Sequence, residues 1–172
     1  MNLSEIRFPR RLEADDTAEA IRQALLAHTV KLWPGGDLEV PVITMSDPLK
    51  KVFLNARLQG RLCYGFEAIT AKVEGERKGI ANVRKRNDSP YGERVSRLLL
   101  LSSDGAERFY RHVEALLHEH SPRLLGCLLD IDSSALGELL AGKGSRIKVV
   151  MAEHKDVVIE ALQAMVGDPG LP

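Results

Sequence analysis

The sequence has no net charge, few aromatic residues and no long apolar run. Its 172 residues include 24 basic and 24 acidic side chains, and aromatic residues make up 5%. No apolar stretch approaches the roughly 20 residues that a membrane-spanning helix needs. The start, MNLSEIRFPRRLEADD, carries charges where a signal peptide would be apolar. We therefore expect a cytoplasmic protein without membrane partners. The 44% hydrophobic content also excludes a disordered or collagen-like chain.

Cysteine is scarce as well, which excludes two kinds of stabilising site. Cys63 and Cys127 lie far apart in the sequence and form no Cys-x-x-Cys pair. Neither a disulfide framework nor a zinc cluster is therefore indicated. Both lie in apolar contexts, so we expect two buried thiols, and we expect no metal or other cofactor.

Apolar residues recur with helical and strand spacing along most of the chain. Residues 1–46 are predicted to be an N-terminal extension of one helix and one strand, with Pro41 placing that strand at a sheet edge. Three nearly continuous apolar segments, in RVSRLLLLSS, LLGCLLDI and RIKVVMA, alternate with helical segments. Such strands are typical of a parallel sheet covered on both faces. The predicted α/β fold is a three-layer α/β/α sandwich with a mainly parallel sheet over 47–172, with a basic loop inserted at about 76–94.

Acidic side chains at a predicted strand end are the main candidates for catalysis. Asp130 and Asp132 end the apolar segment LLGCLLDI, where two carboxylates could hold magnesium and attack a phosphoryl group. This arrangement resembles the nucleophile motif of haloacid-dehalogenase phosphatases. In that family the serine-bearing strand end follows the aspartates, whereas Ser102-Ser103 precede them here. Because Asp132 also suits a helix cap, a structural role is favoured, and a magnesium-dependent phosphoryl-processing enzyme stays an alternative.

Two further patterns are assigned structural roles. GELLAGKG, over 137–144, matches all but the last position of a phosphate-binding loop, but its inner residues are helix formers and a strand follows. Its glycines are expected to end a helix. His112, His118 and His120 share one predicted helix, with Glu114 one turn before His118. Without a third ligand on a known neighbouring element, a solvated helix face is favoured over a metal site.

The strongest local signal is electrostatic. Residues 77–97 contain seven basic and two acidic residues, a net charge of +5 in a chain that is neutral overall. The basic residues are Arg77, Lys78, Arg84, Lys85, Arg86, Arg94 and Arg97. Asn, Ser, Pro and Gly between them predict a loop, and Tyr91 adds an aromatic ring. An arginine-rich loop with an aromatic residue can bind phosphates and stack on a base, and a merely solvated loop is the other interpretation.

Three strings give the chain a family resemblance: FLNARLQGRLCYGFEAI, RVSRLLLLSSDGAERF and SALGELLAGKGSRIKVVMAEHKDVVIEAL. Over about residues 53–165, their order resembles the kink-turn-binding ribosomal protein superfamily, which includes release-factor C-terminal domains and bacterial ribosome-associated relatives. The resemblance implies an RNA-binding fold in which Gly65 begins a helix whose N-terminus approaches an RNA backbone. Kink-turn-binding members carry Asn-Glu shortly after this glycine, where this sequence has Glu67-Ala68. The basic stretch is an insertion relative to the family.

The sequence therefore predicts a non-catalytic RNA-binding protein, associated with ribosomes or structured RNA through a basic loop and a helix N-terminus. The expected RNA-binding residues are Gly65, Glu67, Lys78, Arg84, Lys85, Arg86, Tyr91 and Arg94. The alternatives are the phosphoryl-processing enzyme described above and a protein-interaction module. Self-association is left open.

Overall fold

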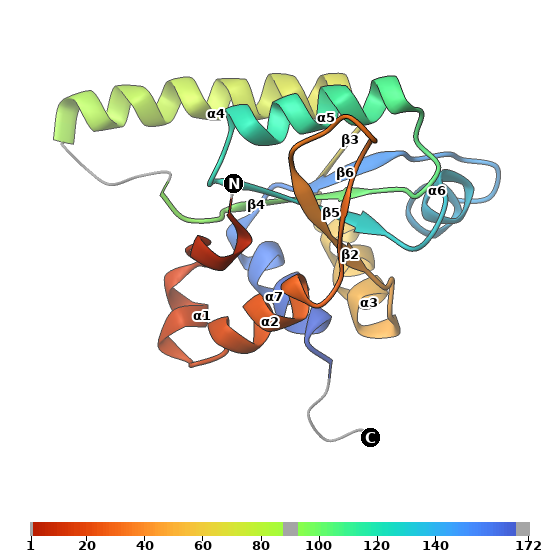
Figure 1. Ribbon diagram of the computed structural model, residues 1–172, viewed down its shortest axis with the longest axis horizontal. Coiled ribbons are helices and arrows are strands. Elements are labelled where there is room, and N and C mark those ends of the chain that lie inside the picture. The colour runs from red at the N-terminus through yellow and green to blue at the C-terminus, as the bar shows by residue number, and fades with distance from the viewer. Residues whose placement is uncertain (1, 88–92, 168–172) are drawn as a thin grey trace.

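The computed structural model describes residues 2–87 and 93–167, where a six-stranded sheet lies between two layers of helices (Figure 1). The strands are β1 (Thr29–Lys31), β2 (Glu39–Ile43), β3 (Leu62–Tyr64), β4 (Arg97–Leu101), β5 (Leu124–Leu129) and β6 (Val149–Ala152). The α-helices are α1 (Arg10–Ala14), α2 (Ala18–Leu26), α3 (Asp47–Leu58), α4 (Phe66–Asn87), α5 (Glu107–Glu119), α6 (Ser133–Ala141) and α7 (Lys155–Met165), and a 3-10 turn covers Leu3–Glu5. The predicted three-layer α/β/α sandwich is confirmed. Within the described ranges, no helix combines the length and apolar character needed to cross a membrane.

The strand order is β1-β2-β5-β4-β6-β3. The adjacent strands β2, β5 and β4 pair in parallel, as expected for strands joined by helical crossovers. The pairs β1–β2, β4–β6 and β6–β3 are antiparallel. The sheet is thus mixed, with its parallel pairing at the centre.

Strand β6 runs antiparallel to β4 because of where the chain enters it. Ile147 donates its N–H to the carbonyl of Ser133 at 2.9 Å, and the Lys148 carbonyl accepts the N–H of Ser102 at 2.9 Å. Ser102 and Ser133 follow the carboxyl ends of β4 and β5. The chain therefore starts β6 at the edge where its neighbours finish, which reverses its direction.

The N-terminal residues belong to the sandwich rather than lying beside it. Phe8, Leu12, Ile21 and Leu25 are at most 1% exposed and pack in the same hydrophobic cluster as the inner faces of α3, α6 and α7. A second cluster lies under α4 and α5, on the other face of the sheet. The segment 2–46 thus contributes to both apolar layers, since Leu32, Leu38 and Val40 belong to the second cluster.

Strand β2 is internal, so the edge position inferred from Pro41 is wrong. Val42 donates its N–H to the carbonyl of His28, on the β1 side, at 2.9 Å. Backbone N–H directions alternate along a strand, so the nitrogen of Pro41, one residue earlier, is on the β5 side. Pairing with β5 begins only at Val42, opposite Leu128. The missing N–H of proline therefore falls just before the ladder starts, where it breaks no bond.

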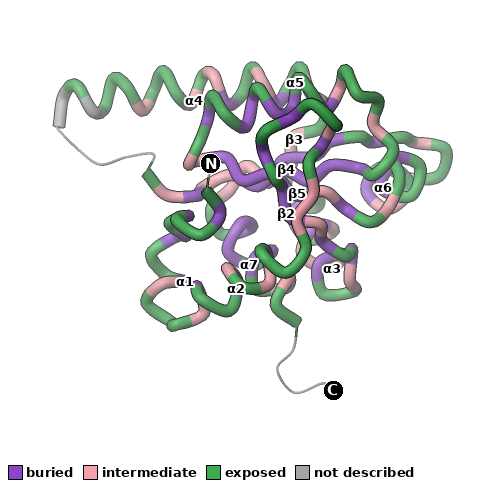
Figure 2. The backbone as a smooth tube through the Cα atoms, in the orientation of Figure 1, coloured by how far each residue is buried: buried purple, intermediate pink, exposed green. Residues whose placement is uncertain are grey.

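The largest departure from the sequence prediction is in α4. The basic loop expected at about 76–94 is helical as far as Asn87, and the predicted stacking residue Tyr91 lies outside the described residues. The helical period of Ile69 and Val73 continues through Ile80 and Val83, which indicates one helix. Figure 2 shows that the buried positions of α4 lie in its first half, whereas the described residues from Arg77 onward are exposed or half-buried.

Two smaller expectations have different outcomes. Residues 137–144 form the end of α6 and a turn, as predicted, and Gly142 and Gly144 have φ values of +102° and +86°. Cys127 is buried, also as predicted, but Cys63 is only half-buried because it lies in the edge strand β3. The prediction of a second buried thiol is therefore wrong.

Candidate functional site

The carboxylates at the ends of the parallel strands hold the loops around them. Asp130 accepts the N–H of Met45 at 3.0 Å, and Asp132 caps α6 by accepting the N–H of Ala135 at 2.8 Å. Asp104 accepts both the N–H and the hydroxyl of Ser133, at 2.8 and 2.7 Å. The Ser133 hydroxyl is the main cause of a lowered pKa at Asp104. Among the described residues, the groups with metal-binding spacing include neither Asp130 nor Asp132.

The basic part of α4 projects beyond the helix next to it. Helix α5 ends at Glu119, and Arg77 of α4 donates to the Glu119 carboxylate at 2.9 Å. From Lys78 to Asn87, α4 continues for roughly 15 Å. In Figure 1 this end of α4 extends to the left, past α5 and past the sheet. Residues 78–87 contain four basic residues and no acidic residue.

Helix α4 is fixed to the sheet just before this projection begins. Glu76 accepts two hydrogen bonds from Arg97 on one oxygen, at 3.2 and 3.0 Å, and Arg123 approaches the other oxygen at 2.6 Å. The three side chains are 15–18% exposed, so solvent screens these charges only in part. The projecting half of α4 is therefore the extension of a firmly anchored helix.

The opposite end of α4 carries the other predicted contact. Gly65 has a φ of +86°, which residues with a Cβ rarely adopt, and the chain turns there from β3 into α4. Glu67 is exposed in the first turn. A hollow of about 340 Å³ opens beside this turn, lined by Arg57, Gly60, Leu62, Tyr64, Leu140 and Ala141.

The structure separates the predicted RNA-binding residues into three places. Gly65 and residues 84–86 lie at opposite ends of α4, roughly 30 Å apart. Arg94 is engaged elsewhere, because it donates to Glu13 at 2.7 Å and to the carbonyl of Phe8 at 2.9 Å. Lys78 and Lys85 are exposed on the projecting half of the helix. A single compact site that includes all the predicted residues is therefore excluded.

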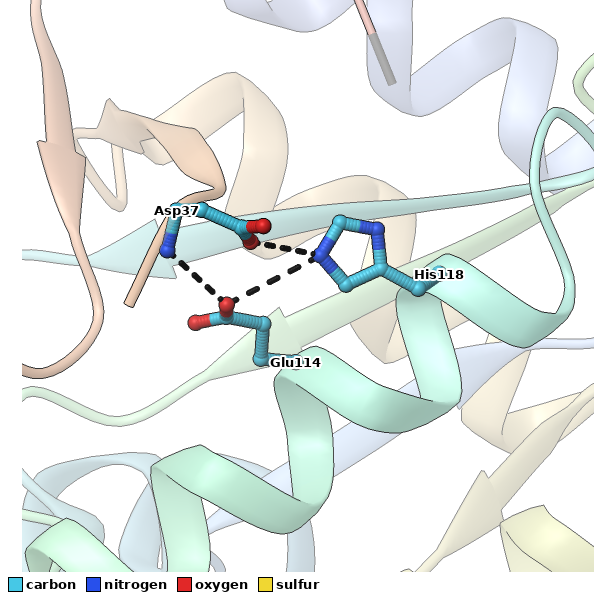
Figure 3. Close-up of side chains that lie close together, drawn as sticks. All are labelled: Asp37, Glu114 and His118. Carbon is cyan, nitrogen blue, oxygen red and sulfur yellow. Dashed lines mark hydrogen bonds and ion pairs between the residues drawn. The ribbon is translucent and has the colours of Figure 1, made fainter. Parts of the chain in front are cut away.

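A second cluster combines residues that the sequence keeps far apart (Figure 3). His118 Nε2 lies 2.8 Å from Asp37 Oδ1 and 3.7 Å from Glu114 Oε1. Glu114 Oε1 also accepts the backbone N–H of Asp37 at 3.1 Å. The Glu114–His118 pair was evident from its spacing, but Asp37 is 77 residues before Glu114. No sequence pattern marked Asp37, because the fold alone places the turn before β2 against α5.

Comparison of the chain with protein-family models gives no match, and comparison with curated proteins gives none either. The resemblance to the kink-turn-binding superfamily stays a prediction.

Proposed function

We propose that this chain is a non-catalytic, cytoplasmic RNA-binding protein that binds structured or ribosomal RNA along the projecting half of α4. The observation that carries the proposal is the charge of that half. Lys78, Arg84, Lys85 and Arg86 extend the helix past Arg77 and Glu119 with no acidic residue between them. Cations on one exposed helix can neutralise several backbone phosphates and release their counterions, which is the main source of affinity in such complexes.

Helix stability alone accounts for only part of this charge. Basic residues in the last turn of a helix interact favourably with the negative end of the helix dipole. This effect explains the basic residues at positions 84–86, which lie in the last turn of α4. That effect fades within one turn of the end, so Lys78 lies outside it. The projecting half also has little apolar packing to hold it, since Ile80 is half-buried and Val83 is 37% exposed. Packing within the protein therefore does not explain why the chain has this helical projection, whereas binding of a ligand to it would.

The start of α4 would be a second, weaker contact. The first N–H groups of a helix have no partner within it and can bind a phosphate oxygen. Tyr64, which is 37% exposed, comes directly before Gly65 and lines the hollow with Arg57. An RNA that contacts both ends must extend along the whole of α4.

Binding to an RNA hairpin, measured by fluorescence anisotropy, tests the proposal. The test variant is Arg84→Gln/Lys85→Gln/Arg86→Gln, which removes three charges and keeps residues that favour a helix. The matched control is Lys51→Gln/Arg108→Gln/Lys155→Gln, which removes the same charge from exposed positions on α3, α5 and α7. At about 100 mM salt we expect the test variant to bind at least about tenfold more weakly than the wild type, and the control to bind nearly as well as the wild type. Equal losses in both variants would contradict a site on α4.

One observation favours the protein-interaction module as a second candidate. Val73, Ile80 and Val83 continue one helical stripe, and its last two members are not buried. A partner helix could cover them. Ile80→Gln/Val83→Gln would then abolish partner binding, whereas loss of RNA binding should follow the three basic residues.

A further inference from the structure

The turn between β1 and β2 packs closely against α5. Gly36 lies so near Glu114 Oε2 that a Cβ at this position would collide with it, and Trp33 Nε1 would be 3.0 Å from that Cβ. The Arg111 guanidinium stacks over the Trp33 ring at 4.5 Å from its centre. The glycine and the stacked ring together hold Asp37 over the helix face that carries Glu114 and His118 (Figure 3).

Glu114 is a buried acid with an incomplete set of partners. Its side chain is 9% exposed, and its carboxylate points toward Asp37 and the ring of His118 (Figure 3). Oε1 accepts the Asp37 N–H, but Oε2 has no hydrogen-bond partner among the described residues. A buried carboxylate is unfavourable unless a cation or a full set of donors compensates it.

Among the described residues, no lysine or arginine forms an ion pair with Asp37 or Glu114. The ion-pair contacts of Asp37 and Glu114 in the described part of the chain are with His118, which is charged only when protonated. The two carboxylates therefore share one histidine as their ion-pair partner. A divalent cation would compensate the charge of both acids at once.

The donor atoms have the spacing of a metal site. One ligand atom from each of the three residues lies within 4.8 Å of the other two. Metal–ligand bonds of about 2.0–2.2 Å in a tetrahedral site place the ligand atoms roughly 3.3–3.5 Å apart. The distances of 2.8 and 3.7 Å from His118 Nε2 to the two carboxylates lie on either side of that value. Small side-chain rotations would therefore accommodate the ion.

We infer that Asp37, Glu114 and His118 form a binding site for one divalent transition-metal ion, zinc being the best match to one imidazole nitrogen and two carboxylate oxygens. Asp37 and His118 are open to solvent, with side chains 82% and 43% exposed, so an ion can enter and keep a water ligand. The site is independent of the proposed RNA surface, which it does not include.

The neighbouring cluster of Glu74, Glu119 and His120 has metal-binding spacing too, but it already contains a cation. Arg77 donates to Glu74 at 2.8 Å and to Glu119 at 2.9 Å, and it bridges the two carboxylates. A metal ion there would have to displace this guanidinium. The cluster therefore serves as the internal comparison for the test.

Trp33 is the one tryptophan of the chain and lies beside Gly36 and Glu114, so its fluorescence reports on the site. The full-length protein, freed of metal with a chelator, is titrated with Zn²⁺ by calorimetry and with Co²⁺ by Trp33 quenching and visible absorption. We expect one equivalent to bind. Asp37→Asn and His118→Gln, at exposed positions where folding should be unaffected, should each weaken binding at least about tenfold.

His112→Gln and Glu119→Gln are the matched controls, since both lie on α5 and are exposed. We expect both to bind metal like the wild type. The inference is overturned if the wild type gives no saturable response to micromolar metal, in which case the three side chains only fasten the turn to α5. It is also overturned if Glu119→Gln abolishes binding while His118→Gln does not, because the metal would then occupy the Glu74 cluster.

Discussion

At the scale of single residues, the two cysteines differ in reactivity because they differ in burial. Burial raises the pKa of Cys127 to about 12, so almost no thiolate forms near neutral pH. The pKa of Cys63 is raised as well, first by burial and then by the charge of Glu153, but this thiol is only half-buried. A thiol reagent should label one cysteine in the native protein, faster at pH 9 than at pH 7, and two after unfolding. Equal native labelling of both, measured by peptide mass spectrometry, would contradict the structure.

Glu13 should make stability depend on pH. Its hydrogen bond from Arg94 lowers the pKa below the usual 4.5, and it also accepts the N–H of Phe8 at 3.1 Å. Because the folded-state pKa is the lower one, the stabilisation is present above pH 4.5 and is lost as the pH falls through the folded-state pKa. Since Glu13 and Arg94 are about one-third exposed, we expect Glu13→Gln to lower the unfolding free energy by only about 0.5–1 kcal/mol at pH 7.

Urea unfolding of Glu13→Gln and of the wild type, at pH 7 and again well below pH 4, measures this effect. The difference between the two proteins should shrink at the lower pH. A difference that stays constant or grows would assign the effect to something other than the Glu13 charge.

At the scale of elements, the attachment of α4 to the sheet depends on Glu76. Removing its carboxylate leaves Arg97 and Arg123 mostly buried without their shared partner. We expect Glu76→Ala to lower the unfolding free energy by about 2–4 kcal/mol. Glu67→Ala, at an exposed position on the same helix, should change it by less than about 0.5 kcal/mol. Similar unfolding midpoints for the two variants would show that α4 is held by its apolar residues alone.

The existence of most elements was predicted correctly from the sequence, whereas the second half of α4 was predicted to be a loop. The apolar segments before Ser102 and Asp130 are continuous and form buried strands, as their pattern indicates. The helical period continues through Ile80 and Val83, but Gly79 and the Asn, Ser, Pro and Gly residues from Asn82 to Gly92 favour a loop by local propensity. The helix is held just before these residues by Glu76 and its two arginines, which are contacts between distant segments that local propensity does not include.

At the scale of the whole molecule, the sequence was least informative about long-range placement. The parallel centre of the sheet was predictable from helix–strand alternation, but the reversal of β6 depends on the contacts of Ser102 with Lys148 and of Ser133 with Ile147. The same holds for the cluster of Asp37, Glu114 and His118. Glu114 and His118 share one face of α5, whereas Asp37 reaches them only because the β1–β2 pair lies at the edge of the folded sheet.

The salt dependence of RNA binding tests the central proposal most directly. Each phosphate contact contributes about −0.7 to −0.9 to the slope of log affinity against log salt concentration. If residues 84–86 contact phosphates, Arg84→Gln/Lys85→Gln/Arg86→Gln should make the slope less steep by about 2 to 3 than that of the wild type, and the Lys51, Arg108 and Lys155 control should keep the wild-type slope. Identical slopes for all three proteins, or no RNA binding by the wild type, would contradict the proposal that the projecting half of α4 is an RNA-binding surface.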